Sequence, residues 1–131
     1  DEPIDAMIYM LTAALGFAAL ENTLFLLAPL SNGDVAKSLL TGNLRFIGAT
    51  LLHIAASSIV GAFSAFFFYK GRKVHDIAIV IGLVVAVALH AAFNLIINTQ
   101  ADRSLIVAFA VAWATIIVVL AMFEKVKRLH R

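Results

Sequence analysis

The first long apolar segment of the chain, residues 6–29, reads AMIYMLTAALGFAALENTLFLLAP and contains Glu21 and Asn22 in its second half. About 20 apolar residues are enough for an α-helix to cross the hydrocarbon core of a bilayer. A strand of that length is unusual, and open sheet edges cannot face lipid, so the segment predicts a transmembrane helix. Because an ionisable side chain inside such a helix is costly unless it faces protein or water, Glu21 is a candidate functional residue.

Three further apolar segments, residues 46–69, 77–97 and 105–123, have a similar length. Together the four segments predict an all-α fold, a polytopic membrane bundle of four transmembrane helices. The composition agrees, since 63% of the 131 residues are hydrophobic and 14% are charged, which excludes an ordinary soluble domain. We expect residues 1–131 to form a single integral membrane domain.

Basic residues predict the orientation of this bundle. They cluster after the second and fourth segments, at Lys70, Arg72, Lys73, Lys125, Lys127, Arg128 and Arg131, whereas residues 30–45 and 98–103 hold three between them. Because Lys and Arg favour cytoplasmic loops, both clusters and both ends of the chain are expected in the cytoplasm. Basic residues at helix ends are topology signals, so the formal charge of +2 does not indicate nucleic-acid binding.

Polar residues that are uncommon in lipid occur on three of the four segments. They are Glu21, Asn22, His53, His90 and Asn94. With a rise of 1.5 Å per residue, Glu21 lies about 12 Å inside the outer end of its segment, and His53 and His90 lie about 10 Å inside theirs. The shared depth predicts one polar cavity in the outward half of the bundle.

Two further residues are positioned to support this cavity. Phe17 precedes Glu21 by four residues and shares its helix face. Arg45 precedes His53 by about two turns, near enough to steer or neutralise a carboxylate.

General-base activation of water is the chemistry that suits these residues. Glu21 or His53 would accept the proton of a water that attacks a carbonyl, while His90 and Asn94 would donate to the oxyanion. The sequence has no HExxH zinc motif, no GxSxG elbow and no cysteine. Glu21, His53, His90 and Asn94 are therefore the predicted catalytic residues.

The motifs Phe17-x-x-x-Glu21-Asn22, Arg45 followed by His53, and His90-x-x-x-Asn94 resemble the second, third and fourth motifs of the PrsW family of intramembrane proteases. This family is distantly similar to the CAAX prenyl endopeptidases and bacteriocin-processing enzymes. The resemblance implies a glutamate-type peptidase of the bacterial cytoplasmic membrane, cutting a membrane-protein or peptide substrate such as a membrane-bound regulator. It also leaves open a divalent metal such as zinc, with Glu21, His53 and His90 as ligands.

The sequence departs from the family pattern in two places. A Glu-Glu pair followed by Lys, the family's first motif, is not reproduced by Asp1 to Asp5 and is expected on a helix upstream. The chain is therefore expected to be part of a longer protein, and without that helix to be inactive. The glycine expected five residues after His53 is Ser58, and Gly61 is the nearest glycine.

Two functions from other classes also fit some of these residues. A b-type haem could be bound between His53 and His90, which lie at one depth, but Glu21 would then have no role. A proton-relay or transport subunit would explain Glu21 but gives no reason for three motifs in order. The sequence does not indicate an oligomeric state.

Overall fold

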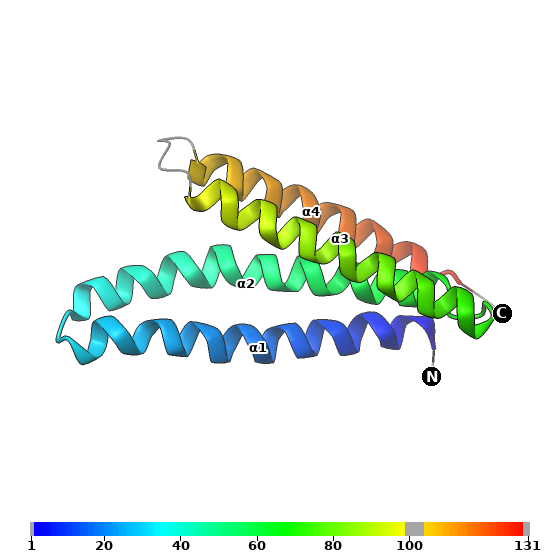
Figure 1. Ribbon diagram of the computed structural model, residues 1–131, viewed down its shortest axis with the longest axis horizontal. Coiled ribbons are helices and arrows are strands. Elements are labelled where there is room, and N and C mark those ends of the chain that lie inside the picture. The colour runs from blue at the N-terminus through cyan, green and yellow to red at the C-terminus, as the bar shows by residue number, and fades with distance from the viewer. Residues whose placement is uncertain (1, 99–103, 130–131) are drawn as a thin grey trace.

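The computed structural model describes residues 2–98 and 104–129, without the side chains of residues 28, 37, 41–47, 97, 98, 104, 105 and 108. It contains four antiparallel helices, α1 (Pro3–Ser31), α2 (Val35–Phe66), α3 (Arg72–Asn98) and α4 (Ser104–Val126) (Figure 1). Each helix includes a segment long and apolar enough to cross a membrane. Since the described residues form no strand, the predicted all-α membrane bundle is confirmed.

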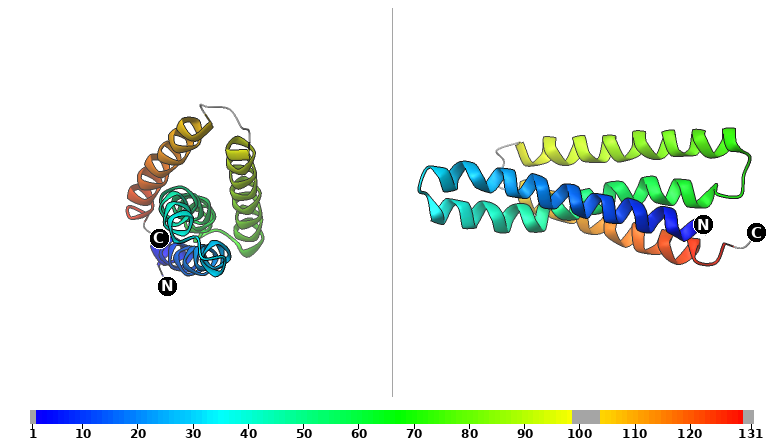
Figure 2. Two further views of the ribbon diagram at one scale, coloured as in Figure 1. Left: turned by 90° about the vertical axis from the view of Figure 1, so that its left-hand side faces the viewer. Right: turned by 90° about the horizontal axis from the view of Figure 1, so that it is seen from below.

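Helix α2 lies at the centre of the bundle (Figure 2). It packs against all three other helices, most extensively against α1, whereas α1 and α3 do not pack against each other in the described part of the chain. Accordingly, 56% of the membrane-length apolar stretch of α2 is buried inside the bundle, compared with 11% for α1 and 17% for each of α3 and α4. The outward apolar faces of α1, α3 and α4 are thus available to lipid.

Small residues allow the neighbouring helices to approach α2 closely. A Cβ atom added at Gly61 would lie 2.8 Å from Cα of Met7 on α1, and one added at Gly82 on α3 would lie 2.9 Å from Cβ of Phe63. Ala62 is completely buried between these contacts. Membrane helices pack closely where small residues let their backbones approach. Gly61 therefore provides the close packing that the family pattern led us to expect from a glycine one turn earlier, at position 58.

Helix α2 begins at Val35, well before residue 46, where its apolar segment was expected to start. The chain reverses at Gly33, whose φ of 76° is readily adopted only by glycine, and Ser38 N–H then donates to the carbonyl of Asp34. The Ser38 hydroxyl also donates to the carbonyl of Leu26 at 3.3 Å, which ties the start of α2 to α1. The hydropathy pattern therefore predicts the apolar, membrane-length part of a helix and misses the polar turns that extend it.

Other boundaries also differ from the predicted segments. Helix α2 ends at Phe66 instead of residue 69, and the backbone N–H of Lys70 donates to Phe67 in the turn that follows. Helices α1 and α3 begin earlier than predicted, at Pro3 and Arg72, and α4 continues to Val126. Each extension adds polar residues that the apolar pattern does not include.

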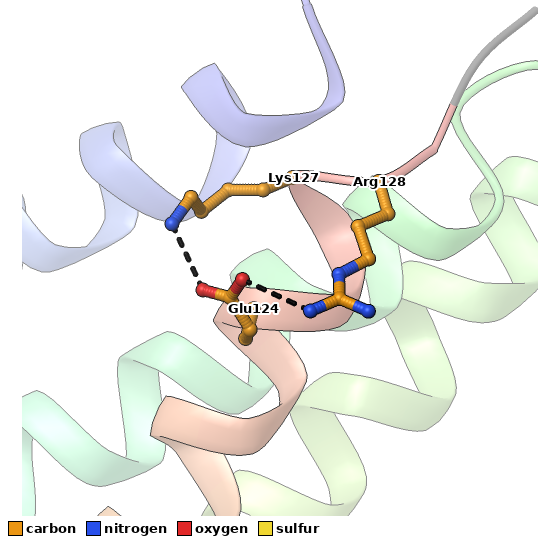
Figure 3. A network of polar contacts seen from close by, with 3 residues as sticks. All are labelled: Glu124, Lys127 and Arg128. Atoms are coloured by element: carbon orange, nitrogen blue, oxygen red, sulfur yellow. Dashed lines mark hydrogen bonds and ion pairs between the residues drawn. The ribbon is translucent and has the colours of Figure 1, made fainter.

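The start of α1, the α2–α3 turn and the end of α4 lie at the same end of the bundle (Figure 1). The basic residues of 70–73 and 125–128 are therefore gathered at one end. There Glu124 accepts hydrogen bonds from Lys127 at 2.8 Å and Arg128 at 3.4 Å (Figure 3). At the start of α1, Glu2 N–H donates to the Asp5 carboxylate at 2.8 Å, a capping arrangement with Pro3 at the first helical position.

Candidate active site

Glu21 on α1 and His53 on α2 form a direct side-chain contact between the two helices. Oε2 of Glu21 lies 3.0 Å from Nε2 of His53, within hydrogen-bond and ion-pair distance. Only 10% of the His53 side chain and 29% of the Glu21 side chain are exposed. The two groups share one hydrogen, held by the imidazole or by the carboxyl, so the contact is an acid–base pair inside an apolar bundle.

Two further rings contact the same imidazole. The Phe17 ring on α1 meets the His53 ring edge-on with centroids 5.1 Å apart, and the His90 ring on α3 is tilted against it at 5.3 Å. His53 thus contacts side chains of both neighbouring helices. Because α2 is the central helix, a residue on it is the one that can join α1 to α3.

A second polar contact lies close to this group. The Asn22 amide, one residue after Glu21, donates to the Thr50 hydroxyl on α2 at 2.9 Å. Its Oδ1 is buried and accepts no hydrogen bond from the described residues. The contact fixes α1 against α2 about one turn from the Glu21–His53 pair, and so helps to hold that pair in register.

An open groove of about 220 Å³ adjoins the two histidines. Its floor is α2, and its walls are α1 and α3, which do not meet. Apart from the histidines and one serine its lining is apolar, formed by Met10, His53, Ala56, Ser57, Val60, Leu83, Ala86, Val87 and His90. The arrangement brings an acid–base pair and a second imidazole to the end of an apolar groove.

Comparison with protein families identifies the family of this chain. A model of the PrsW family, described as intramembrane metalloproteases, matches residues 1–123. The chain belongs to the PrsW family. No curated protein and no solved structure matches the chain.

Membership of the PrsW family confirms the resemblance drawn from the three motifs. Together with the four membrane-length helices, it identifies an integral membrane protein with a domain of a protease family. It also disfavours the haem and proton-relay alternatives. The His53 and His90 rings contact each other at 5.3 Å, which leaves no room for a porphyrin between them.

The structure brings together only some of the residues predicted for the PrsW site. Glu21, His53, His90 and Phe17 are in contact. Asn94 lies one turn beyond His90 but is exposed and does not line the groove. The predicted supporting role of Arg45 concerns a side chain outside the described part of the structure.

Thr50 is a partner that the sequence did not indicate. A threonine in a helix most often bonds to the carbonyl four residues earlier, as Thr12, Thr23 and Thr115 do here. Only its position three residues before His53 could have suggested a link to the site. The packing of α1 against α2 makes it the partner of Asn22.

Glu21, His53 and His90 include the donor types that zinc prefers in peptidases. Their arrangement does not fit a metal ion, because the described residues contain no group of three His, Cys, Asp or Glu side chains that could hold one. His53 Nε2 is directed at the Glu21 carboxylate at 3.0 Å.

Proposed function

We propose that this domain is an intramembrane endopeptidase in which Glu21 and His53 activate water to hydrolyse a peptide bond in or beside a membrane segment. The 3.0 Å contact between Glu21 Oε2 and His53 Nε2 is the observation that carries the proposal. A carboxylate and an imidazole in hydrogen-bond contact can pass a proton between them, as general acid–base catalysis requires. Family membership supplies the reaction class.

In the proposed reaction, the Glu21–His53 pair accepts a proton from water as the water oxygen bonds to the carbonyl carbon of the substrate. The carbonyl oxygen becomes negatively charged, and His90 lies beside His53 in a position to donate to it. The C–N bond then breaks, and the proton held by the pair passes to the leaving nitrogen. Asn94 is proposed as a second donor, because it follows His90 by one helical turn.

The experiment measures cleavage of a single-span membrane substrate by the protein expressed from its complete gene and reconstituted into vesicles. His90→Ala removes one proposed oxyanion donor and is expected to lower the rate about 10²- to 10³-fold. Thr115→Ala is the control, because the Thr115 hydroxyl donates to the Val111 carbonyl of its own helix, α4. Full activity in both His53→Ala and His90→Ala proteins would refute the proposed mechanism.

We further propose that the protein resides in a bacterial cytoplasmic membrane with both ends of this chain in the cytoplasm, and that its substrate is a membrane-bound regulator. The gathering of basic residues at one end of the bundle supports this orientation. Since the chain has no cysteine, single cysteines at Ser31 and Arg72 give a clean test. An impermeant thiol reagent is expected to label them from opposite sides, and labelling from one side would reverse the proposal.

A further inference from the structure

The groove beside the histidines has a definite size and direction. It extends from His53 to Val60 along α2 and from His90 to Leu83 along α3. Each path spans seven residue-to-residue steps, or about 10 Å along a helix axis. The groove therefore runs from the Glu21–His53 pair toward the α2–α3 turn.

These dimensions decide what form of chain can enter. An α-helix with side chains is about 10–12 Å wide, which a groove of about 220 Å³ cannot hold. An extended peptide advances about 3.3 Å per residue, so about three residues cover the length of the groove. A cavity of about 150 Å³ accommodates a benzene ring, so the groove has room for one or two apolar side chains.

We propose that this groove is the substrate side-chain subsite of the protease, and that it selects an apolar residue within three positions of the cleaved bond. The inference rests on the proposed function. The proposed occupant of the groove is an unwound part of the substrate's membrane segment, because the groove is continuous with His53 and His90. A chain that lies along the groove has its peptide bond beside the acid–base pair.

The floor and one wall of the subsite have different roles. Ala56 on α2 is buried and small, and it creates the space without contributing bulk. Val87 on α3 is 60% exposed and borders the groove, so its size limits what enters. Val87 is thus the specificity-determining residue, and replacing it leaves the packed core of the bundle intact.

Val84 offers a matched control for Val87. It lies on the same helix three residues earlier, is the same residue type and is 62% exposed, but it does not line the groove. Val87→Trp is expected to fill the groove, whereas Val84→Trp adds the same bulk on a surface that faces lipid. Circular dichroism and thermal unfolding in detergent verify that both variants are folded.

The experiment compares cleavage of single-span substrates that carry Ala, Leu or Phe at each of the three positions on either side of the cleaved bond. A methylene group in an apolar pocket is worth about 10- to 200-fold in kcat/KM, so the wild-type protein is expected to prefer Leu to Ala at one position by at least about 10-fold. In Val87→Trp the ratio of kcat/KM for the Leu and Ala substrates is expected to fall toward one. Val84→Trp retains the wild-type preference.

The outcomes separate this inference from the proposed function. If wild-type protein cleaves none of the substrates, the proposed function fails. If wild-type protein cleaves but Val87→Trp keeps the Leu preference, the subsite is overturned. An equal change for all substrates, as expected if a lipid chain occupies the groove, overturns it as well.

Discussion

His53 and His75 both contact side chains of another helix, and their surroundings differ. His53 lies on the central helix with 10% of its side chain exposed, against Glu21 of α1 and the ring of His90. His75 lies at the start of α3, where its Nε2 is 3.1 Å from the Ser64 hydroxyl and its Nδ1 is 3.9 Å from the exposed carboxylate of Asp76. Both have a polar partner, but only His53 has an ionisable partner inside the bundle.

The comparison shows that the cost of losing a histidine's polar partner depends on where the contact lies. At the end of the bundle, water can replace a lost partner, so the contact between Ser64 and His75 is a local link between α2 and α3. Inside the bundle the surrounding side chains are mostly apolar, so an unpaired Glu21 would be costly. Four predictions test this difference.

The largest effect is expected from Glu21→Gln, which keeps the shape of the side chain but removes its ability to accept a proton. Loss of the general base is expected to reduce the rate of peptide cleavage about 10²- to 10⁴-fold. The measurement is a single-turnover cleavage assay in vesicles, with Glu124→Gln at the exposed end of α4 as the control. Near-normal cleavage by Glu21→Gln would mean that the buried contact of His53 matters no more for activity than the contact of His75.

Next in size is the loss of stability from Gly61→Ala, which disturbs the packing that holds α1 on α2. The added Cβ would lie 2.8 Å from the backbone of Met7, and such overpacking typically costs about 1–3 kcal/mol. Gly16→Ala is the matched control, because a Cβ at Gly16 meets nothing within 4 Å. Unfolding in mixed detergent measures both, and equal stability of the two variants would contradict the close contact.

A smaller effect is expected from breaking the Asn22–Thr50 hydrogen bond, which lies about one turn from His53. Asn22→Leu, Thr50→Val and the double variant form a thermodynamic cycle for this contact. Hydrogen bonds between membrane helices average about 0.6 kcal/mol, so a coupling energy of that order is expected. A coupling of zero would mean that the bond at 2.9 Å does not help to position Glu21.

The smallest effect is expected from His75→Ala, which makes at the end of the bundle the same substitution as His53→Ala. His75 neither contacts the Glu21–His53 pair nor lines the groove, so the rate of cleavage by the folded protein should change by no more than about twofold. The same cleavage assay applies. A loss comparable to that of His53→Ala would assign the α2–α3 turn to the active site.

Much of the site was predictable because a polar residue in an apolar segment is easily recognised. Glu21, His53 and His90 stood out by their depth, and the structure brings them into contact. Asn94 has the same sequence signal but is exposed, since a shared helix face does not decide whether a neighbouring helix covers it. Thr50 had no signal, because its partner is chosen by the packing of α1 on α2.

The sequence by itself determined the four helices, their membrane-length apolar segments and the PrsW motifs, because hydropathy and spacing act locally along the chain. Only the tertiary structure decided that α2 is the central helix and that α1 and α3 remain apart. This separation follows from where small residues such as Gly61 and Gly82 allow backbones to meet. The groove beside His53 is a consequence of that packing, and no local pattern encodes it.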